Sequence, residues 1–73
     1  MQLFTKPTDK TLVLNVSLNS KISEIKRIIS KKINVPVKYI NLTHVGKKMD
    51  DDKTVKYYNI HNNANIWTTF KVF

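Results

Sequence analysis

The spacing of apolar residues changes twice along this chain, and this restricts the folds that can bury them. Apolar and polar residues alternate with a period of two, as in strands, over residues 3–5, 12–16 and 40–44. Helical spacing replaces this alternation over residues 22–29, and residues 66–73 are β-branched and aromatic, as in a final strand. This order predicts an α+β domain in which one helix packs across a sheet.

The predicted helix has a signal at each end. Asn19 and Ser20 carry side chains that cap helix N-termini well, so we expect the helix to begin just after them. Asn34 suits a left-handed cap at the C-terminus, because asparagine tolerates positive φ better than most residues. Pro36 then prevents the helix from continuing.

The apolar members of these segments predict one small core. A chain of 73 residues buries roughly 60% of the surface that it exposes when unfolded, which leaves too little for a core and a deep substrate cleft together. The side chains expected inside, with Tyr58 at the edge, are Leu3, Leu12, Leu14, Val16, Ile22, Ile25, Ile29, Ile40, Leu42, Met49, Val55, Ile60 and Ile66.

The chain is strongly basic, with a net charge of +8 from 13 basic and 5 acidic residues. Such an excess favours association with acidic proteins, nucleic acid or anionic membranes. The basic residues are spread along the whole chain, which favours compositional bias over a dedicated binding site.

Cysteine is absent, there is no secretory signal, and no apolar run approaches the roughly 20 residues that span a bilayer. We therefore expect an intracellular protein of the cytoplasm or nucleus, without membrane binding.

With this order of elements in hand, the residues resemble ubiquitin over nearly the whole chain, and Tyr58–Ile60 is the most specific stretch. The other matching positions are Met1, Gln2, Phe4, Lys6, Lys10, Thr11, Leu14, Val16, Ile22, Lys26, Ile29, Lys32, Pro36, Leu42, Gly46, Lys47, Asp51 and Thr54. The resemblance implies the β-grasp fold, a mixed sheet packed on one α-helix. It also implies a single ubiquitin-like domain over residues 1–73, either the N-terminal part of a longer protein or a stand-alone relative.

Several glycine positions of ubiquitin are occupied by other residues in this chain. Asp9, Asn34 and Asp52 are residue types that accept positive φ, so we expect the backbone conformation to be retained there. Val45 does not fit, because positive φ is costly for a β-branched residue. Either Val45 is strained by about 1–3 kcal/mol, or its hairpin turns differently.

Both functional features of ubiquitin differ here. Conjugation needs a tail ending in Gly-Gly, whereas this sequence ends in Lys71-Val72-Phe73, so the chain as given is not expected to be activated. The apolar patch that ubiquitin receptors bind corresponds to the Pro7-Thr8 turn, Thr43, Trp67 and Thr69. Threonine replaces its central aliphatic residue, so we expect typical ubiquitin receptors to bind poorly.

Strand alternation places Trp67 on the outer face of the sheet, and tryptophan is over-represented among interface hot spots. Each functional interpretation has a structural alternative. Trp67 would fold down over its neighbours, and the lysines around it would form an ordinary solvated face. The candidate partner-binding residues, aromatic or threonine at the centre and lysine at the rim, are Trp67, Thr43, Thr69, Phe4, Lys6, Lys47 and Lys71.

Other polar residues are expected to be structural. The resemblance implies that Lys26 is partly buried and pairs with Asp51, and that the Tyr58 hydroxyl bonds backbone near Asp50. His44 and His61 are isolated, so neither a metal site nor a catalytic set of side chains is expected. We expect no enzyme activity and no cofactor.

The sequence thus favours a monomeric, non-catalytic ubiquitin-like protein-interaction domain of the ubiquitin–proteasome or chaperone network. Its partner would be a proteasomal, chaperone or ubiquitin-handling protein. One alternative is a covalent modifier whose Gly-Gly tail is missing from this sequence. Another is a basic β-grasp domain that binds nucleic acid, which the salt dependence of binding would reveal.

Overall fold

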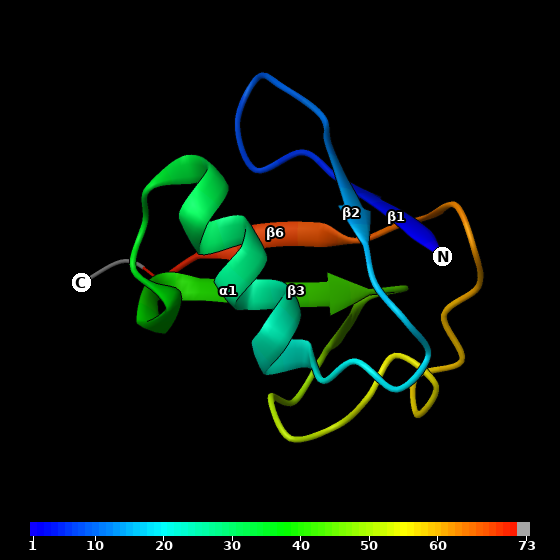
Figure 1. Cartoon of the computed structure of the whole chain (residues 1–73). Helices are drawn as coiled ribbons and strands as arrows, with labels where there is room; N and C mark the ends of the chain where they lie inside the picture. The colour runs from blue at the N-terminus through cyan, green and yellow to red at the C-terminus, as the bar shows by residue number, and fades with distance from the viewer. Residues whose placement is uncertain (72–73) are drawn as a thin grey trace.

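One helix lies across two small sheets in the computed structural model, which describes residues 1–71 (Figure 1). In chain order the elements are β1 (Gln2–Thr5), β2 (Leu12–Asn15), α1 (Ile22–Ile33), the 3₁₀ turn η1 (Val37–Tyr39), β3 (Ile40–His44), β4 (Lys47–Lys48), β5 (Ala64–Asn65) and β6 (Trp67–Phe70). The predicted strands and helix occur in the expected order, and the structure adds one short strand that was not predicted, β5. The last two residues of the predicted final strand, Val72 and Phe73, lie outside the described residues.

Each sheet has three strands, in the orders β2–β1–β5 and β4–β3–β6. β1 is antiparallel to β2 and parallel to β5, whereas β3 is antiparallel to both of its neighbours. Ile66 separates β5 from β6, and its N–H donates to the Phe4 carbonyl at 2.8 Å. The Thr5 and Thr68 hydroxyls form a further hydrogen bond of 2.6 Å between β1 and β6. The two sheets therefore act together as the mixed sheet of the expected α+β β-grasp fold.

The core lies between α1 and the sheets, and it is close to the predicted one. Leu12 and Val16 are only partly buried, because Leu12 is the first residue of the edge strand β2 and Val16 follows its last residue. Ala64 is buried although the sequence pattern did not indicate it. It pairs with Leu3 in the parallel ladder between β1 and β5, a contact between residues far apart in sequence.

The start of α1 differs from the prediction. Its cap is Lys21, which makes no side-chain capping hydrogen bond. The first N–H groups of the helix, those of Ile22 and Ser23, donate instead to the backbone carbonyls of Lys53 and Asp51 at 2.9 and 3.2 Å. Because a distant loop satisfies these donors, a side-chain cap is not needed. The Ser20 hydroxyl accepts a hydrogen bond from the Ser17 N–H at 3.0 Å.

The end of α1 follows the prediction, but two of the expected left-handed turns do not. Asn34 has φ 61° and its N–H donates to the Ser30 carbonyl at 2.8 Å. Among the described residues, positive φ at a non-glycine position occurs at Asn34, Val45, Asn59 and Asn63, and so not at Asp9 or Asp52. Around Asp52 the chain closes a turn differently, with the Lys53 N–H donating to the Asp50 carbonyl at 3.2 Å.

Val45 does adopt the strained conformation. It and Gly46 form the two-residue loop between β3 and β4, with φ of 51° and 76°. Positive φ at both loop residues is the pattern of a type I′ hairpin turn, for which Asn-Gly is the favoured sequence. The left-handed conformation costs an ordinary L-residue about 1–2 kcal/mol, so the valine weakens this hairpin.

Candidate functional site

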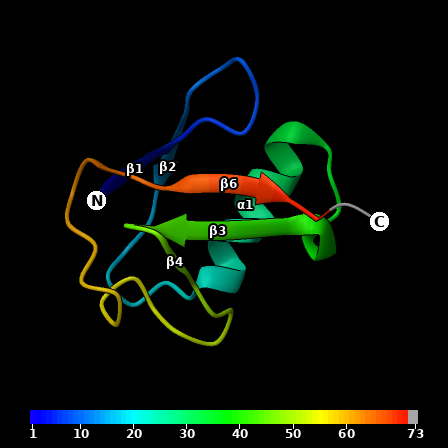
Figure 2. The ribbon, with the colours of Figure 1, turned by 180° about the vertical axis from the view of Figure 1, so that it is seen from behind.

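The outer face of the second sheet is turned toward the viewer in Figure 2, with α1 behind it. Strand register places Thr43 directly opposite Trp67 on β6 and directly opposite Lys48 on β4. Residues opposite one another in a sheet project from the same face. Lys48, Thr43 and Trp67 therefore form one row across three strands, and Asn41 and Thr69 form the next row along β3 and β6.

Trp67 is exposed over 68% of its surface, as alternation predicts. Ile66 before it is buried, and Thr68 after it is half-buried and bonded to Thr5. Beside the indole lies a shallow hollow of 290 Å³, lined by Lys6, Thr11 and Asn65 among others. The indole is therefore accessible to a partner.

Phe4 lies in the other three-stranded sheet. It is half-buried in β1, opposite Val13 on β2 and opposite Asn65 on β5. Trp67 pairs instead with Thr43 in the other sheet. The candidate residues therefore divide into a row centred on Trp67 and a neighbouring pair, Phe4 and Val13, on the first sheet.

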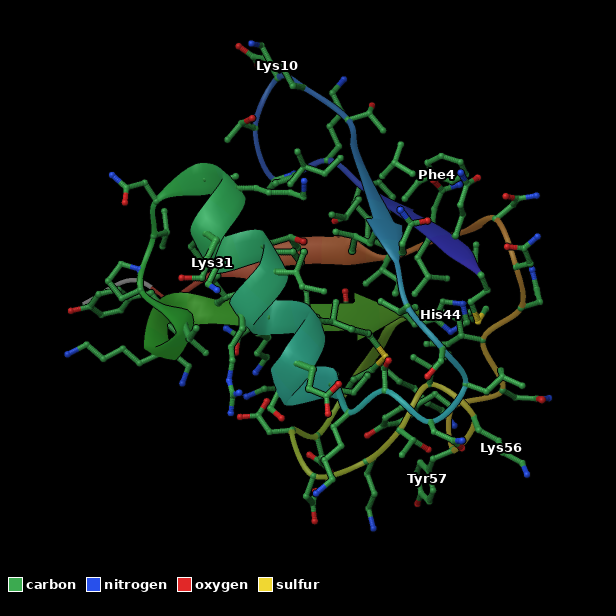
Figure 3. All side chains as sticks on the ribbon, viewed as in Figure 1. Phe4, Lys10, Lys31, His44, Lys56 and Tyr57 are labelled. Carbon is green, nitrogen blue, oxygen red and sulfur yellow. The ribbon has the colours of Figure 1, made fainter. Side chains whose placement is uncertain are left out.

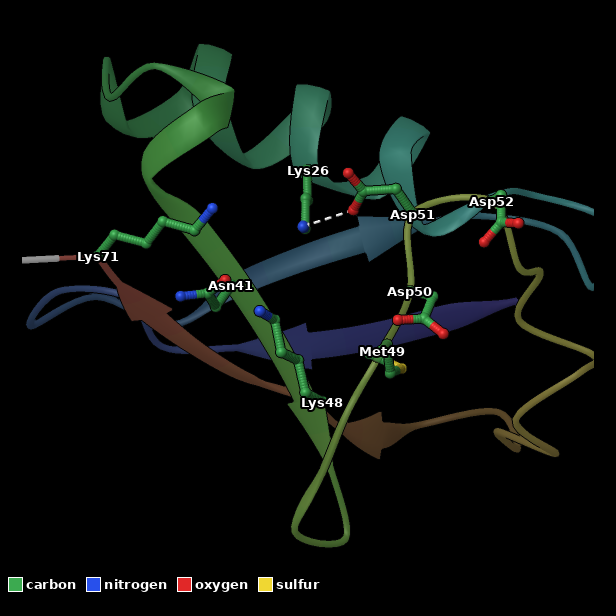
Figure 4. A pocket seen from close by; sticks show the side chains of 8 residues that line it. All are labelled: Lys26, Asn41, Lys48, Met49, Asp50, Asp51, Asp52 and Lys71. Carbon is green, nitrogen blue, oxygen red and sulfur yellow. Dashed lines mark ion pairs between the residues drawn. The ribbon is translucent and has the colours of Figure 1, made fainter.

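The lysines at the rim are arranged differently from the sequence-based expectation. Lys6 lines the hollow beside Trp67, as expected. Lys47 pairs with His44, one position out of phase with Thr43, so Lys48 is the lysine of the Trp67 row. Counting the alternation back from the turn at Val45–Gly46 would have identified Lys48. Lys71 follows the last residue of β6, where its N–H donates to the Tyr39 carbonyl at 2.8 Å and its side chain lines another hollow with Asn41 and Lys48 (Figure 4).

These observations can be set beside known proteins. The sequence profile described as Ubiquitin family matches residues 3–71. The chain belongs to the ubiquitin family. Ubiquitin-like protein 4A of Rattus norvegicus and of Mus musculus is 34% identical over 67 residues, covering 90% of this chain. Ubiquitin-like protein 1 of Schizosaccharomyces pombe is 34% identical over 53 residues, covering 73% of this chain and 68% of that protein.

The match differs in extent among these relatives. The chain spans 43% of the length of ubiquitin-like protein 4A. NEDD8-like protein RUB3 of Arabidopsis thaliana is 32% identical over 53 residues, which cover 73% of this chain and 68% of that protein. The comparison therefore establishes a ubiquitin-like domain.

Two contacts that the resemblance implies are present in this ubiquitin-family domain. Lys26 Nζ lies 2.5 Å from Asp51 Oδ1 (Figure 4), and the lysine side chain is almost buried. The Tyr58 hydroxyl accepts a hydrogen bond from the Asp50 N–H at 2.6 Å. The first contact ties the segment after β4 to α1, and the second closes that segment on itself, so the role of both is structural.

The described part of the chain holds no cluster of three or more histidine, aspartate or glutamate side chains that could bind a metal ion. Within residues 1–71 there is also no helix with the length and apolar character needed to cross a membrane. The five acidic residues lie at Asp9, Glu24 and Asp50–Asp52, outside every strand. The outer sheet face therefore carries lysine without a carboxylate on its strands.

Proposed function

We propose that this domain is a non-catalytic interaction domain, which binds a protein partner through the outer face of β3 and β6. The observation that carries the proposal is Trp67, an indole exposed over 68% of its surface and held opposite Thr43 in a regular ladder. Burying such a large ring against a partner removes much apolar area from water, and tryptophan is among the residues enriched at interface hot spots. Because its strand is paired along its length, the ring is presented on a rigid element.

The charge around Trp67 indicates an acidic partner. Lys6 borders the hollow beside the indole, and Lys48 stands across Thr43 from it. Within the described chain no strand carries a carboxylate, but Asp50, Asp51 and Asp52 line the hollow shared by Lys48 and Lys71, so the Lys6 side of the indole is the side that favours acidic groups. Lysines at the rim of an interface mainly speed encounter and exclude cationic partners. The favoured partner is therefore an acidic segment with an apolar residue at its centre.

Membership of the ubiquitin family supports a partner of the ubiquitin–proteasome or chaperone network: a proteasomal, chaperone or ubiquitin-handling protein. On this proposal the domain acts inside the cell, as a monomer. Thr43 supplies less apolar area beside Trp67 than an aliphatic residue would, so we expect modest affinity.

An amide chemical-shift titration tests this proposal, with a proteasomal receptor and an acidic peptide as separate candidate partners. Shifts should cluster on Trp67, Thr43 and Lys48 as partner is added. Leu18 provides the matched control, because it is also an exposed apolar residue but lies outside the strands. If shifts gather on α1 around Arg27 and Lys31 while Trp67 stays silent, the binding surface is on the opposite side of the domain and the proposal is wrong.

A further inference from the structure

A third hollow, of 730 Å³, lies between the β3–β4 turn and the segment that precedes β5. One wall carries His44, Val45 and Lys47, and the other carries Tyr57 and Tyr58. In Figure 3 the Tyr57 side chain extends beyond the ribbon into solvent. We call this the Val45–Tyr57 hollow. It meets the Trp67 row at Lys48, which lines both, but His44 and Lys47 are one position out of phase with Thr43 in the ladder and do not belong to that row.

The strain at Val45 is the first observation that points to a ligand. Val45 has φ 51° in a turn where asparagine is favoured, yet its side chain is 82% exposed. Valine therefore destabilises the turn in which it lies, and its side chain gains little packing inside the domain in return. Backbone strain that folding does not explain is a reason to look for function at that residue. Here the function that fits is an apolar contact with something outside the domain.

The second observation is that the opposite wall carries an aromatic ring, that of Tyr57, whose position is fixed. Tyr57 is 63% exposed, but its position is fixed on several sides. Its N–H donates to Thr54 Oγ1 at 3.1 Å, and its ring meets the Tyr58 ring edge-on, with centroids 5.0 Å apart. The Lys53 ammonium lies 4.8 Å from its ring centroid. A ring held in this way loses little conformational freedom when a ligand packs on it.

The charges around the hollow indicate which kind of ligand it binds. Lys47 and Lys48 line the hollow against a single carboxylate, that of Asp50, and Lys53 covers part of Tyr57. Carboxylates of a ligand would be attracted to these ammonium groups, while an apolar side chain packs between Val45 and Tyr57. The requirement is thus one bulky apolar residue with acidic residues on both sides.

We propose that the Val45–Tyr57 hollow is a second docking surface, which binds an extended acidic peptide by inserting one bulky apolar side chain between Val45 and Tyr57. This surface goes beyond the proposed function, because it does not use Trp67. A partner with two acidic segments could then occupy both surfaces of one domain at once, which would raise its apparent affinity above that of either contact alone.

Fluorescence anisotropy with a labelled acidic peptide that has leucine at its centre tests the proposal. Val45→Asn suits the turn better than valine, so it should leave thermal stability unchanged or raised while weakening binding by about tenfold. Tyr57→Ala should weaken binding by about thirtyfold, as expected for an aromatic hot spot. Leu18→Ala is the matched control, because Leu18 is an exposed apolar residue that lines neither the Val45–Tyr57 hollow nor the hollow beside Trp67, and its binding of this peptide should stay within about twofold of the wild type.

Four results would overturn the proposal. The first is wild-type affinity for the peptide in both Val45→Asn and Tyr57→Ala. The second is a large loss in Trp67→Ala alone, which would move the peptide to the outer sheet face. The third is equal binding of a peptide with serine in place of the central leucine, or tighter binding of a single-stranded oligonucleotide, since either means that charge alone is recognised. No binding by the wild-type domain also contradicts it.

Discussion

Lys26 Nζ lies 2.5 Å from Asp51 Oδ1, but the two side chains differ in environment: the lysine is 8% exposed and the aspartate 59%. The two partners of this ion pair are therefore not equivalent. Removing the aspartate leaves an ammonium group buried without its partner, whereas removing the lysine leaves a carboxylate that water can solvate.

We predict that Asp51→Ala lowers the free energy of unfolding by about 2–4 kcal/mol. Lys26→Met keeps the volume of the side chain and should cost no more than about 1 kcal/mol. Urea unfolding followed by circular dichroism measures both. Asp52→Ala is the control, because Asp52 is a neighbouring exposed carboxylate. Equal losses for Asp51→Ala and Lys26→Met would contradict the asymmetry.

Truncation of the core should be far more costly than truncation of the surface. Ile29 on α1 and Leu42 on β3 are both fully buried, so replacing either with alanine leaves a cavity between helix and sheet. Each substitution should cost about 2–5 kcal/mol. Val13→Ala, at a strand position 43% exposed, should stay within about 1 kcal/mol of the wild type. Thermal or urea unfolding provides the comparison, and a loss below that of Val13→Ala at either core site would be incompatible with the fold.

The Tyr58 hydroxyl fixes the loop after β4 by accepting the Asp50 N–H. Tyr58→Phe removes this acceptor but retains the ring, so it should cost about 1 kcal/mol, with water replacing part of the bond at this exposed site. Amide hydrogen exchange at Asp50 should speed up in the variant. Tyr57→Phe serves as the control because its ring is exposed. No change in exchange at Asp50 would show that the hydroxyl does not hold the loop.

Two substitutions in the β3–β4 turn should change the free energy of unfolding in opposite directions. Val45→Asn should raise the free energy of unfolding by about 1 kcal/mol, because asparagine tolerates φ 51° better than valine. Gly46→Ala should lower it by about 1–2 kcal/mol, because alanine at φ 76° is strained. A Cβ on Gly46 would have no atom within 4 Å, so this loss would come from the backbone alone. Unfolding curves that shift in the same direction for both variants would argue against a type I′ turn.

At the outer sheet face, Trp67→Ala should weaken the binding of an acidic partner by about 2 kcal/mol or more. Charge reversal at Lys48 should mainly lower the association rate and its dependence on salt. Lys47→Glu should have the smaller effect, since Lys47 is out of phase with the Trp67 row. Stopped-flow kinetics at two salt concentrations separates these effects. A larger effect at Lys47 than at Lys48 would show that the sheet register does not control the interface.

Local spacing along the chain was enough to predict several features of this protein. Period-two alternation identified the strands and placed Trp67 outward, because successive side chains of a strand point to opposite faces. Helical spacing of Ile22, Ile25 and Ile29 gave the buried face of α1. Asn34 gave the end of the helix, since its left-handed conformation is a property of one residue. These signals need no knowledge of what lies across the domain.

Contacts between segments that are distant in sequence are known only from the tertiary structure. The first N–H groups of α1 donate to the carbonyls of Lys53 and Asp51 and not to nearby side chains, because a loop about thirty residues farther along the chain packs against the start of the helix. Lys48 and not Lys47 joins the Trp67 row, because register depends on the number of residues that the β3–β4 turn consumes. Ala64 is buried because β5 pairs with β1. Each outcome rests on contacts between distant residues, which spacing along the chain does not encode.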